Sequence, residues 1–211
     1  MKELETYFQH VPIMAILRGL QPKEAQSIGT VLYEQGVRAF EVPLNKPNAI
    51  ASIARLIEVL PEDTCIGAGT VLSISQVNEL NNLGADIVVS PHTNGELVEH
   101  TLKQSICSIP GFYTPSEAME SINAGAKWLK LFPAGSLPLQ YLTQIKSILS
   151  DEIKVMPVGG INAQNVNAWL AAGADAFGIG GELYRAGDNW RDVSDNLAPF
   201  TKALSRPYDS V

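Results

Sequence analysis

Two ionisable residues stand in apolar runs that predict buried strands: Lys130 in "WLKLF" and Glu41 in "AFEVP". A buried ammonium or carboxylate group is costly without a partner. Burial lowers the pKa of a lysine and so favours the neutral amine, which can attack a carbonyl carbon. A carboxylate beside that amine could act as a general acid and base. The alternative is a structural ion pair between the two side chains.

Strand periodicity distinguishes Lys130 from the nearby Lys127, because side chains three residues apart point to opposite faces of a strand. Lys127 enters at the start of the strand, where we expect it to be solvated. Lys130 lies near the carboxyl end and shares its face with Trp128 and Phe132. Alternation in the other run places Glu41 on the face opposite to its apolar neighbours. Both charged groups are therefore predicted to point into the protein.

Further polar and glycine-rich positions follow other predicted strands. Arg18 ends the run "MAILRG", where a guanidinium could grip a carboxylate with two hydrogen bonds or form a surface salt bridge. The pairs Gly159–Gly160 and Gly180–Gly181 end two later runs, and paired glycines let backbone N–H groups approach an anion. Glu182 opposes this interpretation, because a phosphate-binding loop favours Ser, Thr or a cation at that place.

The elements that position these residues follow from a sequence pattern. Short runs rich in β-branched residues alternate with segments of helical periodicity, which is typical of βαβ units with a parallel sheet. The predicted strands are 13–17, 39–44, 65–68, 87–90, 105–109, 128–132, 154–158 and 176–179. The predicted helices are roughly 22–35, 48–59, 74–83, 94–103, 115–124, 138–149, 163–172 and 189–204.

Eight strand–helix pairs predict a (β/α)8 barrel (TIM barrel) formed by a single domain, residues 1–211. A glycine followed by Ala or Val opens four of the strands, at 36, 84, 125 and 173, and these positions lie about two βα units apart. A doubly wound open sheet would need a glycine-rich first turn, which "AILRGLQP" is not. We expect the first ten residues to form a short extra helix under the barrel. In such barrels, chemistry takes place at the carboxyl ends of the strands.

Composition narrows the class of function. The formal net charge is −7, and no basic stripe indicates nucleic-acid binding. No segment has the pattern of a signal peptide or a membrane span. Two cysteines are too few for a disulfide scaffold, and no Cys/His cluster has the spacing of metal ligands. We therefore expect a cytoplasmic protein that binds neither membrane nor nucleic acid.

Eight motifs, in order and spacing, resemble those of the class I 2-keto-3-deoxy-6-phosphogluconate/2-keto-3-deoxy-6-phosphogalactonate aldolases. The motifs are "AILRG", "EVPLN", "IGAGTVL", "SPH", "IPG", "LKLFPA", "PVGGIN" and "GIGGELYRAG". The resemblance implies a homotrimeric barrel and a lyase that uses neither metal nor other cofactor. It implies that Lys130 is the Schiff-base lysine and that Glu41 is the general acid and base. The implied substrate-binding residues are Arg18, Asn45, Thr70, Pro91, Phe132 and Val158, with Gly159, Gly160, Gly180, Gly181 and Glu182 at the phosphate.

Two departures from the gluconate-type pattern favour the galactonate type. Asn45 replaces an arginine that contacts the substrate carboxylate, and Arg18 is the natural substitute for it. Val158 replaces a threonine near the C4 centre, where the two substrates differ, and Glu182 also fits the galactonate type. The expected reaction converts 2-dehydro-3-deoxy-6-phosphogalactonate to pyruvate and D-glyceraldehyde 3-phosphate. The alternatives are a 2-dehydro-3-deoxy-6-phosphogluconate or 4-hydroxy-2-oxoglutarate aldolase, a sugar-phosphate epimerase, and a barrel that binds sugar phosphates without catalysis.

Overall fold

The computed structural model describes residues 3–204, in which parallel strands alternate with helices. The strands are β1 (Ile13–Ile16), β2 (Ala39–Pro43), β3 (Cys65–Gly69), β4 (Ile87–Val89), β5 (Cys107–Ile109), β6 (Gly111–Phe112), β7 (Trp128–Leu131), β8 (Lys154–Pro157) and β9 (Phe177–Ile179). The α-helices are α1 (Pro22–Glu34), α2 (Ala49–Val59), α3 (Ile74–Leu83), α4 (Gly95–Lys103), α5 (Pro115–Asn123), α6 (Leu139–Lys146), α7 (Val166–Ala171) and α8 (Trp190–Leu204). Two 3-10 helices, η1 (Leu4–Phe8) and η2 (Ala134–Ser136), complete the order. The predicted alternation is confirmed.

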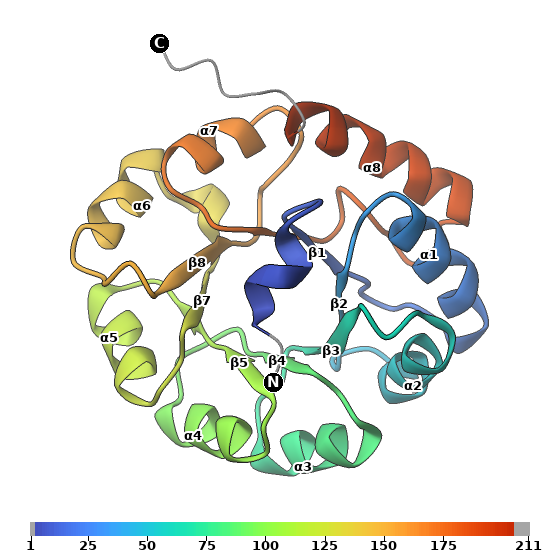
Figure 1. Ribbon diagram of the computed structural model, residues 1–211, viewed down its shortest axis with the longest axis horizontal. Coiled ribbons are helices and arrows are strands. Elements are labelled where there is room, and N and C mark those ends of the chain that lie inside the picture. Colours follow the sequence, from blue (N-terminus) through green and yellow to red (C-terminus); the bar gives the residue numbers. More distant parts are fainter. Residues whose placement is uncertain (1–2, 205–211) are drawn as a thin grey trace.

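The strands form a curled parallel sheet in two pieces, and the helices surround it as a ring (Figure 1). One piece has the order β5-β4-β3-β2-β1-β9, and the other has the order β6-β7-β8. The pieces adjoin at both sides. Pro110, which has no N–H for the ladder, alone separates β5 from β6; the predicted fifth strand, 105–109, ends where β5 ends, and the short β6 beyond it was not predicted. On the other side, Val158 and Gly178 form a parallel bridge between the end of β8 and β9.

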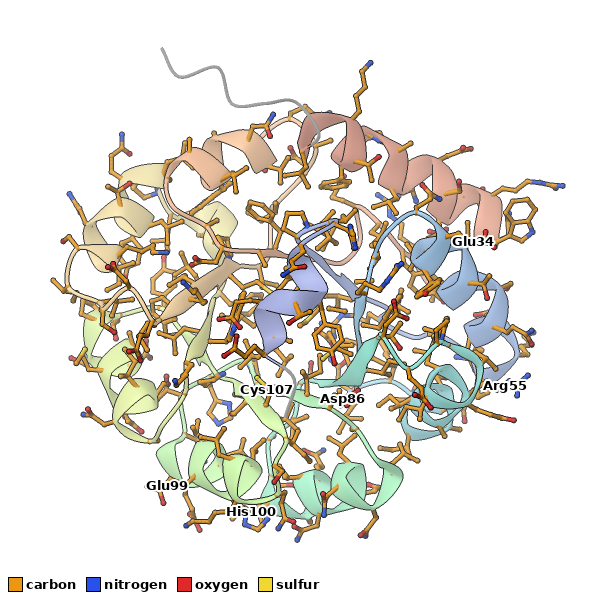
Figure 2. The ribbon with its side chains drawn as sticks, in the orientation of Figure 1. Glu34, Arg55, Asp86, Glu99, His100 and Cys107 are labelled. Carbon is orange, nitrogen blue, oxygen red and sulfur yellow. The ribbon has the colours of Figure 1, made fainter. Side chains whose placement is uncertain are left out.

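Alternate residues of each strand belong to two separate apolar cores, which explains the strand alternation. Phe40 and Val42 of β2 belong to the larger core between the sheet and the helices. Ala39 of the same strand and Trp128 of β7 belong to a smaller core inside the curl. Glu41 and Lys130 share the faces of Ala39 and Trp128, so the predicted inward orientation is confirmed. The outer faces of the helices carry charge, as the outward-pointing Arg55 and Glu99 show (Figure 2).

Helix η1 lies across the amino-terminal ends of the strands, in the middle of the ring in Figure 1. Leu4, Tyr7 and Phe8 are buried and join the inner core. The rings of Phe8 and Trp128 pack with their centroids 5.1 Å apart. The predicted extra helix under the strands is therefore confirmed, in 3-10 form, and it covers this end of the curl.

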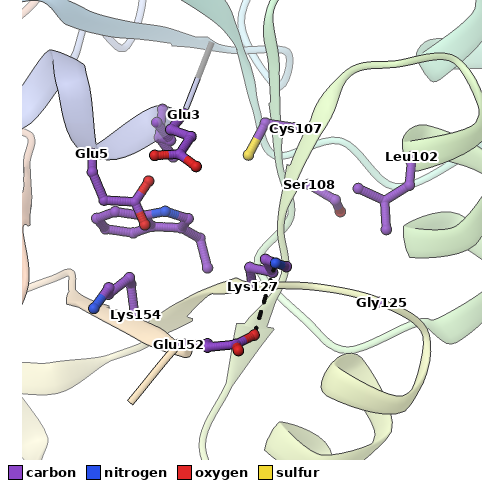
Figure 3. A pocket seen from close by; sticks show the side chains of 11 residues that line it. Glu3, Glu5, Leu102, Cys107, Ser108, Gly125, Lys127, Glu152 and Lys154 are labelled. Carbon is purple, nitrogen blue, oxygen red and sulfur yellow. Dashed lines mark ion pairs between the residues drawn. The ribbon is translucent and has the colours of Figure 1, made fainter. Parts of the chain in front are cut away.

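A cavity of about 480 Å³ lies between η1 and the starts of β5, β7 and β8 (Figure 3). Its walls carry both signs of charge, from Glu3, Glu5 and Glu152 on one hand and from Lys127 and Lys154 on the other. Lys127 is exposed and lies 3.8 Å from Glu152, as the dashed line in Figure 3 marks. The prediction of a solvated Lys127 is confirmed. Within residues 3–204, the helices are too short or too polar to cross a bilayer.

Candidate active site

Lys130 and Glu41 are both buried on the inner face of the curled sheet, on β7 and β2. The exposed fraction is 6% for Lys130 and 2% for Glu41. Lys130 pairs in register with Gly111 of β6 and Met156 of β8, whereas Glu41 pairs with Ile16 of β1. The strands on both sides are apolar or lack side chains at these positions. The charged groups therefore sit in surroundings that oppose their ionised forms.

The pKa values of the two groups shift toward each other. Burial lowers the pKa of Lys130, Arg18 lowers it further, and the Glu41 carboxylate opposes both. Burial raises the pKa of Glu41 to about 7, although Lys130 and Arg18 oppose the rise. A lysine with a lowered pKa supplies more neutral amine at neutral pH. A carboxyl group that titrates near pH 7 can both accept and return a proton.

One oxygen of Glu41 has no hydrogen-bond partner. Oε2 is buried and accepts no hydrogen bond from the described residues. A carboxylate retained only for a structural ion pair should have both oxygens satisfied, because an unpaired buried acceptor destabilises the fold. The unpartnered Oε2 therefore favours the acid–base interpretation over the structural ion pair.

Phe132 lies at the carboxyl end of β7 and covers the lysine. The Lys130 Nζ atom lies 4.9 Å from the centroid of its ring. Phe132 is 37% exposed, so its other face is open to solvent. Phe132 therefore lies beside the buried amine at the carboxyl end of β7, the place where the sequence predicted it.

Arg18 and Asn45 meet across the loops that follow β1 and β2. Arg18 Nη1 donates a hydrogen bond of 2.6 Å to Asn45 Oδ1. The partner is a neutral amide and not a carboxylate, so the positive charge of Arg18 stays uncompensated and reaches Glu41 and Lys130. This arrangement differs from the surface salt bridge that was the alternative for Arg18. It leaves a cation held at the rim for an anion to bind.

Thr70 and Pro91 follow β3 and β4 at the same rim, and both are half-buried. Thr70 has a φ of 55°, a left-handed conformation that is rare for a β-branched residue. Pro91 lies against the backbone of Gly111, the partner of Lys130 in register. The structure thus places both residues at the predicted end of the strands, without a recorded contact to Lys130 or Glu41.

A cavity of about 530 Å³ opens at the carboxyl ends of β8, β9 and β1. It brings together eight predicted site residues: Arg18, Phe132, Val158, Gly159, Gly160, Gly180, Gly181 and Glu182. Glu41, Lys130, Asn45, Thr70 and Pro91 do not line it. Ile16 and Phe132, which do line it, contact the buried pair through strand register and ring packing. The buried pair and the cavity are therefore neighbouring parts of one site.

The two glycine pairs differ in conformation. Gly159 and Gly160 have φ values of 86° and 78°, in the left-handed region that favours glycine. Space is also limited at Gly160, because a methyl group there would press on the Cα atom of Gly135. Gly181 has open space around it. Both pairs line the cavity with backbone that no side chain covers, so an anion can approach that backbone.

Two cations in this cavity escaped the sequence analysis: Lys46 and Arg185. Lys46 directly follows Asn45, and Arg185 lies three residues after Glu182. The Nε atom of Arg185 donates a hydrogen bond of 2.9 Å to the carbonyl oxygen of Gly181. Together with Arg18 they outnumber the one carboxylate of the lining, Glu182, so the cavity suits an anion. Their positions just after the second and eighth predicted strands were the signal that could have identified them.

Residues 3–204 contain no group of three or more His, Cys, Asp and Glu side chains arranged to hold a metal ion. Cys65 and Cys107 are both free thiols, and burial raises the pKa of Cys107 to about 12. Neither thiol is therefore a candidate nucleophile.

Comparisons with known proteins agree on one family. The family model described as KDPG and KHG aldolase matches residues 4–195. A 2-dehydro-3-deoxy-6-phosphogalactonate aldolase of Escherichia coli (strain K12) is 35% identical, over 92% of this chain and 94% of the relative. A probable 2-dehydro-3-deoxy-6-phosphogalactonate aldolase of Rhizobium meliloti (strain 1021) is 37% identical, over 95% and 92%. The solved structure titled "Native KDPGal structure" superimposes with a TM-score of 0.89 at 35% identity, over 92% of this chain and 94% of that one.

Proposed function

This chain belongs to the KDPG and KHG aldolase family, and on that premise we propose that it cleaves 2-dehydro-3-deoxy-6-phosphogalactonate through an imine on Lys130. The products are pyruvate and D-glyceraldehyde 3-phosphate, so the enzyme is an aldehyde-lyase (EC 4.1.2.21). The observation that carries the proposal is the buried amine of Lys130 near a buried carboxyl group whose Oε2 has no partner.

The reaction begins with the neutral amine of Lys130, which attacks the C2 ketone of the substrate. The carbinolamine that forms takes a proton from protonated Glu41 and loses water, which leaves a protonated imine between Nζ and C2 and Glu41 as a carboxylate. This cation accepts the electron pair that is released when the C3–C4 bond breaks. The lowered pKa of Lys130 supports the first step, because only the unprotonated amine is nucleophilic.

Glu41 supplies the proton transfers. Its carboxylate takes the proton of the C4 hydroxyl, directly or through one water, as C3–C4 breaks and the aldehyde leaves. The protonated Glu41 then returns this proton to C3 of the enamine, which becomes the imine of pyruvate. Hydrolysis of that imine frees pyruvate and the lysine. A pKa of about 7 suits both directions of transfer at neutral pH.

The cavity beside this pair anchors the distant phosphate group. The glycine turns after β8 and β9 present backbone, and Arg18, Lys46 and Arg185 present positive charge to the same space. Anchoring the remote end orients the C3–C4 bond over Lys130 and converts binding energy into correct geometry. The cation held by Asn45 serves the carboxylate at C1 of the substrate.

The galactonate epimer is proposed in preference to the gluconate epimer because of Val158. Its side chain is 5% exposed, packs against Gly178 and lines the cavity. An apolar wall at this place offers no hydrogen bond to the C4 hydroxyl of the other epimer.

The architecture and assembly form the remaining parts of the proposal: a closed (β/α)8 barrel in one domain of residues 1–211, a homotrimer, and a cytoplasmic location. The bridge between Val158 and Gly178 and the single residue between β5 and β6 support closure. The trimer and the location rest on the family resemblance.

The test is a side-by-side assay of both C4 epimers and of 4-hydroxy-2-oxoglutarate, with pyruvate release as the readout and the Lys130→Met variant as the control. We expect the highest kcat/KM with the phosphogalactonate and no turnover by the variant. A higher kcat/KM with either other substrate would move the assignment within the family. No pyruvate from any of them would favour an epimerase or a binding protein.

A further inference from the structure

The inner face of β3 carries almost no side chains beside Glu41. Cys65, Gly67 and Gly69 alternate on this face, and Glu41 of the neighbouring strand pairs in register with Gly67. The Glu41 side chain extends past Gly67 toward the carboxyl end of β3. Its carboxylate lies beside Gly69, which pairs in register with Pro43. A methyl group built on Gly69 would overlap both carboxylate oxygens and the carbon that joins them. The Glu41 carboxylate thus lies directly against bare backbone.

The backbone at this point is fixed on both sides. The carbonyl oxygen of Gly69 accepts a hydrogen bond of 2.8 Å from the backbone N–H of Leu44. Two residues later, the N–H of Val71 donates a hydrogen bond of 3.2 Å to the carbonyl oxygen of Val89. Thr70 lies between these bonds with a φ of 55°. Strain of this kind persists only where the surrounding structure determines the conformation, so β3 cannot easily retreat from the carboxylate.

From this geometry we propose that Gly69 is a positioning residue for Glu41, which fixes the carboxylate by having no side chain at a place where the backbone cannot yield. The bare backbone at Gly69 leaves room for the carboxylate at the reaction end of the sheet, with the buried Oε2 packed closest to Gly69. The proposal rests on the acid–base role proposed above for Glu41. Gly69 itself takes no part in the proton transfers.

The first test is Gly69→Ala, with Gly95→Ala as the matched control. Gly95 begins α4 and does not line the cavity at the carboxyl ends of the strands, and a methyl group there would meet only ordinary contacts of 3.7 and 3.8 Å. We expect Gly69→Ala to lower kcat by about 10²-fold, in line with an impaired acid–base group, while borohydride still fixes pyruvate on Lys130. Displacement toward the mouth also exposes the carboxylate, so the acidic limb of the kcat profile moves to lower pH. An unmoved limb, or a loss of the pyruvate adduct together with activity, would overturn the positioning role.

A second test covers the case in which Gly69→Ala folds poorly. Glu41→Ala removes the carboxylate and leaves space for the methyl group. We expect Gly69→Ala to destabilise the protein strongly when Glu41 is present and much less when it is combined with Glu41→Ala, as measured by urea unfolding. Equal losses in both backgrounds would show that the methyl group collides with something other than the carboxylate. Because this cycle needs no catalysis, it separates a failure of the positioning role from a failure of the proposed reaction.

Discussion

Lys127 directly precedes β7 and Lys130 lies within it, yet the two ends of the curled sheet surround them differently. At the amino end, Lys127 is solvated and paired with Glu152, and η1 covers the inner core with apolar side chains. At the carboxyl end, Lys130 and Glu41 are buried, and Oε2 of Glu41 has no partner among the described residues. Charged side chains are thus solvated at one end and buried at the other.

This difference shows that the two ends of the sheet have separate roles: the amino end contributes stability, and the carboxyl end carries the proposed chemistry. Unpartnered buried charges lower stability and persist where they serve a reaction. Packing of η1 against Trp128 buries apolar rings and no unpartnered charge, so it contributes stability. In parallel sheets of this kind, chemistry belongs at the carboxyl ends of the strands. Substitutions at the two ends should therefore separate loss of activity from loss of stability.

The largest expected effect is a loss of kcat/KM on substitution of Lys130 that substitution of Lys127 does not cause. Lys130→Met removes the nucleophile but preserves an apolar chain of similar length, so kcat/KM should fall by about 10³-fold or more. Lys127→Met should leave kcat/KM within about twofold and change the free energy of unfolding by less than about 0.5 kcal/mol. Pyruvate release and urea unfolding measure both. Equal losses of kcat/KM in the two variants would contradict the distinction between the two ends of the sheet.

The next effect concerns the acid–base group. Glu41→Gln keeps the shape of the side chain and abolishes its titration, so turnover should fall by about 10²–10⁴-fold. Formation of the pyruvate adduct on Lys130 should persist, because the amine is intact. Single-turnover kinetics and borohydride trapping give the two readouts. Full activity of this variant would assign Glu41 a structural role.

The amino end should show the opposite behaviour. Phe8→Ala removes a buried ring that packs on Trp128, so the free energy of unfolding should fall by about 3 kcal/mol. Activity per folded molecule should stay unchanged, because η1 is at the far end of the strands. Urea unfolding and an assay normalised to folded protein test this. A fall in kcat of Phe8→Ala without loss of stability would contradict the separate roles of the two ends of the sheet.

Stability should also depend on pH through Glu41. Its pKa is about 7 in the fold against an ordinary value of 4.5, so between these values the folded state binds more protons than the unfolded state. Wild-type stability therefore falls as the pH rises through this range, whereas Glu41→Gln lacks this contribution. The variant should gain roughly 1–3 kcal/mol relative to wild type as the pH rises through this range. A difference that stays constant with pH would mean that the carboxyl group titrates normally.

The smallest expected effect is at the rim. Asn45→Ala removes the hydrogen bond that holds Arg18, so KM for the substrate should rise about 3- to 10-fold with little change in kcat. Asn45→Asp tests the charge explanation, since it would neutralise Arg18 and raise KM further. Steady-state kinetics distinguishes the two. An unchanged KM in both variants would exclude Arg18 from carboxylate binding.

The sequence predicted what depends on strand parity and missed what depends on loop geometry. Lys130 and Glu41 could be placed because alternation along a strand fixes the face of each side chain. Their positions after two predicted strands could have marked Lys46 and Arg185 as candidates, but their direction into the cavity depends on how separate loops fold together. The short strand β6 was not predicted, because Pro110 cannot pair and only two residues, Gly111 and Phe112, continue the sheet beyond it. The contact between Glu41 and Gly69 joins two strands and could be found only in the structure.

The central claim is that Lys130 is the nucleophile, and borohydride reduction in the presence of pyruvate tests it most directly. Mass mapping of the digested protein should locate a reduced three-carbon adduct on Lys130, in step with loss of activity. Lys127, three residues earlier in the chain, serves as the internal control and should stay unmodified. An unmodified Lys130, or an adduct on another lysine with equal loss of activity, would contradict the account.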